Sequence, residues 1–310
     1  IKEERNWKDG KPEGKSTSWY QNGQKKSEHN YEYGNVVGKF TWWYENGQIK
    51  HEGNWKDGKL DGKETWWYES GQIKKQLENW KDGKLDGKET WWYESGQKKS
   101  EHNYEYGKRT SWHENGQLKT EKYWKDGGKN ESKTTSWYQN GQIKTEEYWK
   151  DGVKDGEWTS WHENGQTNKI ENYKNGRREG KSNSFYKNGS AKKEVNWKRG
   201  KLDGDYIEWD QNEKVKIIRL YENGQIKSEK HYKDGELDGE WTSWHENGQK
   251  ESEANYKNNK LNGKFNVWYE NGQIRSVGNT RDDQYDGKQT IWHANGQKKL
   301  ERIWKDGQIE

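Results

Sequence analysis

Histidines and paired acidic residues are the side chains of this 310-residue chain that could bind a metal or carry out catalysis. Four of the eight histidines occupy one repeat position, where tyrosine is the usual alternative: His113, His162, His245 and His293. Histidines that recur at one repeat position could bind a metal. A position shared by His and Tyr instead indicates a surface side chain with an apolar body and a polar tip. We therefore expect a structural role for this column.

The acidic pairs of the DGKLDG segments, such as Asp57 and Asp61, suggest calcium. They match neither an EF-hand loop nor the GGxGxDxUx pattern, and Asp before Gly is ordinary in turns. Glu and Lys recur in nearly every repeat, so no repeat stands out as a catalytic centre. The chain has no Cys, which excludes disulfides and thiol catalysis. We predict no enzyme, no metal and no cofactor; the degraded repeat at 210–221 is the one place left for a small irregular site.

The composition is unusual for a folded chain of this length. Only 25% of the residues are hydrophobic and 35% are charged, a balance typical of disorder. Aromatic residues make up 15%, however, with 23 Trp and 19 Tyr, and each can bury about 150–250 Å². We expect a fold built on aromatic stripes. No run of apolar residues is long enough for a membrane span, and 57 basic residues interspersed with 53 acidic ones do not form a nucleic-acid-binding surface.

The sequence is repetitive, with a period of 24 residues and small slips. The period is marked by the glycine of an NGQ-like motif, at Gly23, Gly47, Gly71, Gly96, Gly116, Gly141, Gly165, Gly189, Gly224, Gly248, Gly272 and Gly296. We predict one continuous array of about 13 hairpin units over residues 1–310, irregular at 107–112 and 205–221. Both termini fall within a unit, which indicates a fragment of a longer chain or a chain that stacks end to end.

Each period contains two extended runs separated by turn residues. Asn-Gly and Asp-Gly are strong hairpin signals, and no segment has a helical period. The predicted fold is therefore all-β, an elongated single-layer array of antiparallel β-hairpins. A three-residue Glu-Asn-Gly loop would pair Trp43 with Ile49 and Thr41 with His51. We prefer it to a two-residue loop, which would pair Trp43 with Lys50, because it places Trp and Ile on one face.

This register predicts a core column of aromatic side chains. Its tryptophans are Trp19, Trp43, Trp67, Trp92, Trp112, Trp137, Trp161, Trp209, Trp244, Trp268 and Trp292. The tryptophans of the partner strands, such as Trp55, are expected to support this column.

The repeat unit resembles a known family. The segment EGNWKDGKLDGK, at 52–63, is similar to the MORN repeat. The full unit, WYENGQIKxExxYKDGKLDGK, resembles the bacterial MORN variant of proteins labelled YwqK-type antitoxins, some of which are surface or secreted proteins linked to adhesion. The resemblance implies a β-hairpin array with a binding or scaffolding role. The chain departs from the general pattern at its final Gly, where Glu64 or Glu89 stands instead.

Three neighbouring repeats carry an additional tryptophan. Trp42, Trp66 and Trp91 replace a residue that is serine in most other repeats, and Phe40 lies two residues before the first of them. These side chains should alternate out of the core column and form an apolar strip on a polar face, which marks a contact surface. The alternative is that a neighbouring segment covers the strip, or that the sheet curls onto itself there.

Two classes of function are compatible with these features. The first is a non-catalytic structural or adhesive protein that binds a protein partner or associates with itself end to end, as an extracellular or cell-surface fibre; a cytoplasmic location also fits a chain without Cys. The second is an aromatic cage for choline or a cell-wall glycan, because choline- and glucan-binding repeats also combine Trp-Tyr pairs with Gly turns. A toxin-neutralising role is a narrower alternative.

Overall fold

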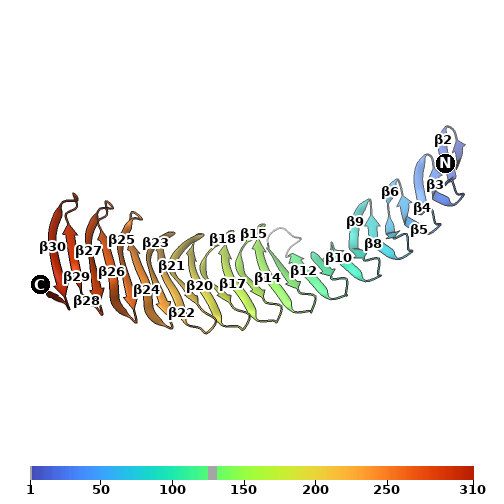
Figure 1. The fold of residues 1–310 in the computed structure, drawn as a ribbon. Helices are drawn as coiled ribbons and strands as arrows, with labels where there is room; N and C mark the ends of the chain where they lie inside the picture. The colour runs from blue at the N-terminus through green and yellow to red at the C-terminus, as the bar shows by residue number, and fades with distance from the viewer. Residues whose placement is uncertain (1, 125–130) are drawn as a thin grey trace. The chain divides into compact units, whose positions relative to one another are not determined.

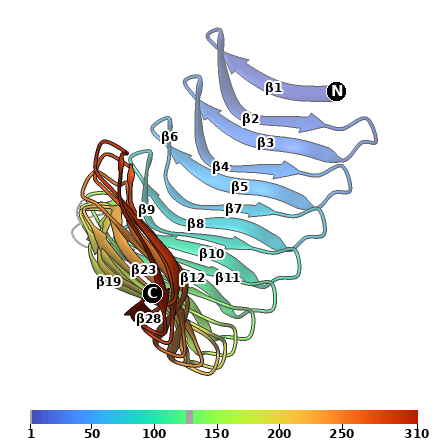
Figure 2. The same ribbon diagram turned by 60° about the vertical axis from the view of Figure 1, so that its left-hand side comes forward.

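The computed structural model describes residues 2–124 and 131–310, and these residues form strands and no helix (Figure 1). They fall into two compact units, Ile1–Gly152 (unit 1) and Val153–Glu310 (unit 2). Within each unit the strands pair antiparallel with their neighbours in the chain, as the hairpins of β1 to β12 show in Figure 2. The fold is thus the predicted all-β hairpin array. The connection at 125–130, a KDG-type turn in sequence, lies outside the described residues.

The strands of unit 1 are β1 (Lys2–Lys8), β2 (Lys11–Trp19), β3 (Lys25–Glu32), β4 (Asn35–Trp43), β5 (Ile49–Lys56), β6 (Lys59–Leu60), β7 (Gly62–Trp67), β8 (Ile73–Lys81), β9 (Lys84–Trp92), β10 (Lys98–Asn103), β11 (Lys108–Trp112), β12 (Leu118–Trp124), β13 (Glu131–Trp137) and β14 (Ile143–Lys150). The strands of unit 2 are β15 (Val153–Lys154), β16 (Gly156–Trp161), β17 (Thr167–Lys174), β18 (Arg177–Arg178), β19 (Gly180–Phe185), β20 (Ala191–Lys198), β21 (Lys201–Trp209), β22 (Val215–Glu222), β23 (Gln225–Lys233), β24 (Glu236–Trp244), β25 (Lys250–Lys257), β26 (Lys260–Trp268), β27 (Ile274–Arg281), β28 (Gln284–Tyr285), β29 (Gly287–Trp292), β30 (Lys298–Lys305) and β31 (Gln308–Ile309).

The NGQ turn is a three-residue loop, as predicted. The N–H of Tyr44 donates to the carbonyl of Gln48 (2.8 Å), and the N–H of Gly47 donates to the carbonyl of Tyr44 (3.0 Å). Gly47 has φ 87°, in the left-handed region that glycine adopts readily. The side chain of Asn46 accepts the N–H of Gln48 (2.9 Å) and donates to the carbonyl of Glu69 in the next repeat (3.0 Å). One asparagine therefore closes its own turn and joins it to the next.

The KDG turn is a two-residue loop. Lys56 and Lys59 pair directly, and Asp57 and Gly58 both have positive φ, 50° and 73°. Two successive residues with positive φ define a type I′ turn, whose twist matches that of the flanking strands. The two turn types thus explain why Asn-Gly and Asp-Gly recur at different places in the repeat.

The strand register is partly as predicted. Trp43 pairs with Ile49, which is confirmed, but Thr41 pairs with Glu52 and not with His51, so the second predicted pair is wrong. The cause is a β-bulge between Trp42 and Trp43, where one residue of β5 has no partner and the register shifts by one. As a result, His51 lies directly opposite Trp42.

The bulge determines which side chains share a face. Phe40, Trp42 and Trp55 line one hollow of unit 1, whereas Thr65 and Trp67 line another. We call repeat positions equivalent to the first group A positions and those equivalent to the second group B positions. The expectation that the Trp55 column supports the core column is therefore wrong, because alternation places these two columns on opposite faces of the sheet.

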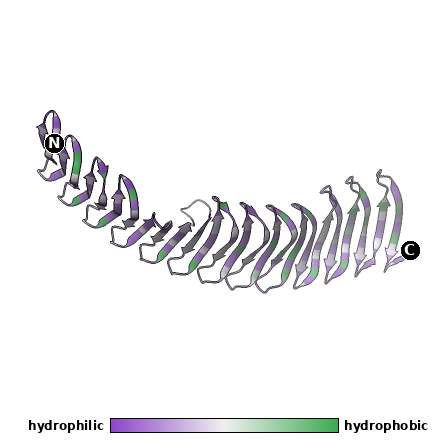
Figure 3. Ribbon diagram, turned by 180° about the vertical axis from the view of Figure 1, so that it is seen from behind, coloured by the Kyte–Doolittle hydropathy of each residue, from purple (hydrophilic) through white to green (hydrophobic). Residues whose placement is uncertain are grey.

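The sheet has thin apolar cover on both faces. Phe40, Leu77, Val195 and Ala254 are its buried hydrophobic residues, and among the described residues no large side chain is completely buried. Hydrophobic residues appear in Figure 3 as short stretches within individual strands. Stability is therefore distributed over many strand pairs.

The position shared by His and Tyr links successive repeats. The hydroxyl of Tyr44 donates to the carbonyl of Trp67 (2.8 Å), and Nε2 of His113 lies 3.2 Å from the carbonyl of Trp137. Both side chains reach the same backbone acceptor one repeat further on. This shared bond explains why the two residue types interchange.

The A and B positions exchange faces within unit 2. Tyr206, at an A position, pairs with Arg219, Arg219 pairs with Glu229, and Glu229 pairs with Thr242. Thr242 is the equivalent of Thr41, at a B position. Because directly paired residues share a face, the B positions from β24 onward lie on the face of unit 2 that carries the A positions of β16 to β21.

The turn types exchange edges at the same place. Gly224 belongs to an NGQ-like motif, yet its N–H donates to the carbonyl of Leu202 (2.7 Å). Elsewhere a bond of this kind links the KDG turns of successive repeats, as between Gly83 and Leu60. On the opposite edge, Lys214 forms an ion pair with Asp234 of a KDG turn (2.7 Å). The repeat between them has lost its KDG turn, so the NGQ-like motif closes that edge and every later hairpin is inverted.

Candidate functional site

The face of unit 1 that carries the A positions, which we call face A, is crossed by a row of five side chains in which tryptophans alternate with other residues. Trp42 on β4 pairs with His51 on β5, which pairs with Trp66 on β7. Trp66 pairs with Lys75 on β8, which pairs with Trp91 on β9. We call these five residues the tryptophan row. The three additional tryptophans are therefore separated by the imidazole of His51 and the ammonium group of Lys75.

The members of the tryptophan row contact one another. The rings of His51 and Trp66 are stacked, with centroids 4.3 Å apart and an interplanar angle of 11°. Nζ of Lys75 lies 4.9 Å from the ring centroid of Trp66 and 4.6 Å from that of Trp91. These are cation–π distances. Trp42 extends the row and is 37% exposed.

Two glutamates hold the side chains of the row in place, and each lies two residues before a tryptophan of the row on the same strand. Buried Glu64 lies 2.7 Å from Nε2 of His51 and accepts the indole N–H of Trp80 (2.8 Å). Glu89 pairs with Lys75 (2.8 Å) and accepts the indole N–H of Trp91 (3.0 Å). These are the two residues that replace the final Gly of the general MORN pattern. The departures from that pattern therefore hold the row in place.

A hollow of about 700 Å³ lies beside the first tryptophan of the row. Phe40 and His29 form part of its wall, with the His29 ring 5.4 Å from that of Trp42 and the Phe40 ring 4.9 Å from that of His51. Arg5 and Glu64 bring opposite charges to the same hollow. The row and the hollow together form an apolar surface with polar groups at defined points.

The pKa values of His29 and Glu89 on this face are shifted. Burial lowers the pKa of His29, and the nearby charge of Arg5 lowers it further, against an opposing effect of Glu3. Burial raises the pKa of Glu89, but hydrogen bonds from Lys75 and Tyr104 outweigh this effect and leave the pKa below its ordinary value. Glu89 therefore remains a carboxylate that can hold Lys75 between the two indoles.

The equivalent positions carry hydroxyl pairs in several other repeats. Ser18 and Ser27 are hydrogen-bonded at 2.7 Å, and Ser136 and Thr145 at 2.6 Å. A small hydroxyl residue therefore satisfies the fold at this position. The indoles of the row are not required for the hairpin to form.

The structure places the sequence-predicted residues as follows. Trp42, Trp66 and Trp91 lie in one row, whereas Phe40 is only 4% exposed and lies beneath its neighbours. The eleven tryptophans of the core column are all partly buried. Sequence reasoning missed His51 and Lys75, since their place in the row depends on the bulge.

Within residues 2–124 and 131–310, no three His, Asp or Glu side chains come together in a way that would hold a metal ion. The same residues form no helix of the length and apolarity needed to cross a membrane.

Comparison with known proteins shows similarity to one repeat family. The family model described as MORN repeat variant matches ten segments, 12–33, 36–57, 60–82, 85–106, 105–126, 131–151, 154–175, 217–234, 237–258 and 261–282. No curated protein sequence matches.

Solved structures show a low similarity. "Crystal Structure of TcdB2-TccC3" has 9% identity and a TM-score of 0.20 over 94% of this chain and 18% of that chain. "Crystal Structure of TcdB2-TccC3-Cdc42" has 9% identity and a TM-score of 0.18 over 94% and 17%. This chain thus spans less than a fifth of the length of those chains.

Proposed function

This chain belongs to the MORN repeat variant family, and from that premise we propose that it is a non-catalytic repeat protein that binds a protein partner through the tryptophan row. The observation that carries the proposal is the replacement of a hydroxyl residue by tryptophan in three successive repeats, on one face. Because the fold needs only a hydroxyl there, the added indoles are best explained by an interaction. Tryptophan is among the residues that contribute most to protein interfaces.

The way the row is held supports binding by a preorganised surface. His51 and Lys75 fill the spaces between the indoles, and Glu64 and Glu89 hold these two side chains in position. Side chains that are fixed before binding lose less conformational entropy when a partner arrives. The row is therefore suited to a partner that presents apolar or aromatic side chains to a flat aromatic surface.

An aromatic cage for choline is less compatible with this arrangement. The ammonium group of Lys75 already lies between the rings of Trp66 and Trp91, at cation–π distance from both. A ligand cation would have to displace this ammonium group and leave Glu89 without its partner. The protein-binding role is therefore the stronger proposal.

We extend the proposal to self-association and adhesion at the cell surface. A second copy of the chain carries the same row, and two flat aromatic surfaces can pack face to face with two-fold symmetry. Sedimentation velocity over a range of concentrations distinguishes a second copy from a different partner.

The test is an affinity capture from native extract with a variant in which the row is changed to Trp42→Ser, Trp66→Ser and Trp91→Ser. Serine is the residue of other repeats at this position, so the fold should be retained. Trp7→Ser is the matched control, because it removes an indole that is 60% exposed and lies outside the row. Loss of a captured protein, or of self-association, in the triple variant alone supports the proposal. Identical capture and sedimentation by all three proteins would refute it.

A further inference from the structure

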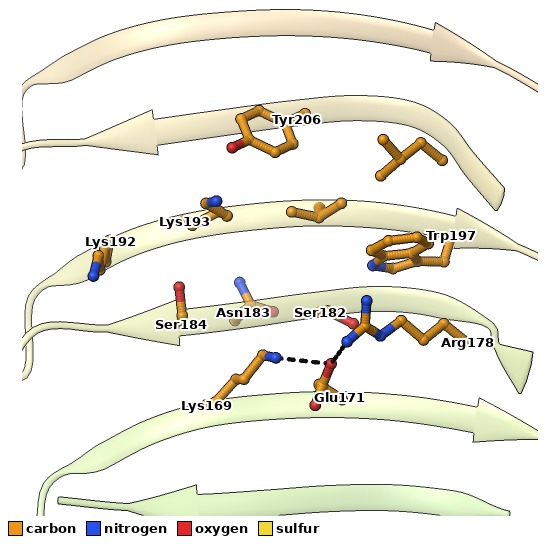
Figure 4. Close-up of a pocket in the computed structure, with 12 residues that line it drawn as sticks. Lys169, Glu171, Arg178, Ser182, Asn183, Ser184, Lys192, Lys193, Trp197 and Tyr206 are labelled. Atoms are coloured by element: carbon orange, nitrogen blue, oxygen red, sulfur yellow. Dashed lines mark ion pairs between the residues drawn. The ribbon is translucent and has the colours of Figure 1, made fainter. Parts of the chain in front are cut away.

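A further hollow, of about 390 Å³, lies in unit 2 over strands β17 to β21. Figure 4 shows its wall, with Arg178 and Trp197 at one end and Ser184 and Lys192 at the other. Nearly all of its residues fall in 176–216, the stretch between two matched repeats of the family. The hollow therefore belongs to the part of the array that departs most from the repeat pattern.

The hollow exists because one A position carries a small residue. The equivalent positions in the repeats before and after Ser182 carry large rings, Trp158 and Tyr206. Val195, the cross-strand partner of Ser182, is buried and forms the floor. Ser182 thus leaves open a space that a ring fills in both flanking repeats.

The hydroxyl of Ser182 is a polar group without a partner at the bottom of this hollow. The residue is 6% exposed, and its oxygen has no hydrogen-bond partner within the described chain. A buried hydroxyl that makes no hydrogen bond is costly, so such a group indicates a ligand that completes it. Ser190, also buried, has by contrast two acceptors within reach of its hydroxyl, Oδ1 of Asn188 (2.7 Å) and the carbonyl of Gln211 (3.3 Å).

The charge around the hollow is positive. Lys169, Arg178, Lys192 and Lys193 line it, against the single carboxylate of Glu171. That carboxylate pairs with both Lys169 (2.9 Å) and Arg178 (2.8 Å), as the dashed lines in Figure 4 show. Lys193 pairs at 3.2 Å with a further carboxylate, Glu208, outside the lining. Four cations against two carboxylates leave a net charge of +2.

The apolar part of the wall is aromatic. The guanidinium group of Arg178 lies 4.7 Å from the Trp197 ring centroid, and Nζ of Lys193 lies 4.9 Å from that of Tyr206. These rings hold the cations beside the opening. An anion that reaches the Ser182 hydroxyl therefore passes between positive groups that are already in position.

We propose that this hollow binds a small organic oxyanion, a carboxylate or a phosphate monoester attached to a compact ring. The oxyanion accepts a hydrogen bond from the Ser182 hydroxyl and pairs with Lys193 and Arg178. The ring occupies the space over Val195 that a side chain fills in the flanking repeats. This site is separate from the tryptophan row, and it does not depend on the function proposed for that row.

The test is isothermal titration calorimetry of the full chain with phenyl phosphate, phenylacetate and inorganic phosphate. Binding of one or both ring compounds, tighter than inorganic phosphate, is expected, and the better of the two identifies the oxyanion. Ser182→Tyr fills the hollow with the residue found at 206 and should abolish binding. Lys193→Gln should weaken it about tenfold or more, the value of a charge-assisted hydrogen bond.

Lys181→Gln is the matched control. This change also removes one lysine charge, but from the opposite face of the sheet, where Lys181 of β19 pairs with Glu194 (2.7 Å). The Lys181→Gln variant should bind the ring compounds as tightly as the unaltered chain does. Ser182→Ala removes only the hydroxyl and keeps the test valid if the tyrosine variant does not fold. The proposal is overturned if neither ring compound binds at millimolar concentration, if inorganic phosphate binds as tightly as they do, or if Lys193→Gln and Lys181→Gln have equal effects.

Discussion

The pair Phe40 and Gly53 allows a quantitative test of how the thin core is packed. A Cβ on Gly53 would lie 2.7 Å from Cε1 and 2.8 Å from Cζ of the Phe40 ring, and 3.2 Å from Cγ of Glu64. Gly53 does not have a positive φ, so the backbone itself accepts alanine. Gly53→Ala should therefore destabilise the β4–β5 hairpin by overpacking alone, by about 1–3 kcal/mol.

The second part of this test removes the aromatic ring of Phe40. Phe40→Ser alone should cost about 3–5 kcal/mol, because it leaves a cavity over Gly53. Phe40→Ser combined with Gly53→Val recreates the natural pair Ser182 and Val195. The double variant should be more stable than the summed effects of Phe40→Ser alone and Gly53→Val alone predict, by about 1–3 kcal/mol.

The assay is native-state hydrogen exchange of the amides of β4 and β5, because repeat arrays open locally. Gly278→Ala is the matched control: its Cβ would lie 2.5 Å from Phe265, so it should weaken β26 and β27 and leave β4 and β5 unchanged. If Gly53→Ala is neutral, or if the two changes simply add, size matching between paired A positions does not hold the sheet together.

Three further predictions follow from other parts of the fold. Lys214→Cys combined with Asp234→Cys, in a chain without Cys, should cross-link with a short reagent, because the ion pair between Nζ of Lys214 and Oδ1 of Asp234 (2.7 Å) places the two residues side by side. Without the inversion the two residues would lie one strand length apart, about 27 Å, and no cross-link would form. The pKa values of His29 and His102 are both lowered, chiefly by burial, so as pH falls these histidines bind protons in the unfolded chain before they do so in the folded chain. The stability of unit 1 should therefore fall as pH drops below about 6.5. Thermal melts at about pH 8 and about pH 5 that coincide would contradict this. Tyr44→Phe removes the bond to the next repeat and should cost about 0.5–1.5 kcal/mol, whereas replacement of the same residue by His should retain part of it, as measured by hydrogen exchange.

The sequence was sufficient to predict the hairpin array and its main turn. Asn-Gly at a constant spacing, with Trp and Ile on either side, specified a three-residue loop and the pairing of Trp43 with Ile49. It was not sufficient for the rest of the register. A bulge that shifts the pairing by one residue has no distinct sequence signal, so the contacts of His51 and Lys75 with the tryptophans depended on the structure.

The inversion at β22 and β23 shows the same limit at a larger scale. The missing turn is visible in the sequence as a strand that runs directly into Glu222-Asn223-Gly224. The inversion that follows from it is not visible in the sequence. The same dipeptide Asn-Gly closes a three-residue loop in other repeats and a two-residue loop here, where Glu222 pairs with Gln225. The strand that the dipeptide joins, and not the dipeptide itself, decides which edge the turn occupies.

The most direct test of the account is hydroxyl-radical footprinting of the protein alone and with its captured partner or second copy. The tryptophan row predicts that oxidation of Trp42, Trp66 and Trp91 falls on binding, while that of Trp43 and Trp67 on the opposite face stays the same. Protection of Trp43 and Trp67 with continued oxidation of the three row residues would contradict the assignment of face A as the binding surface.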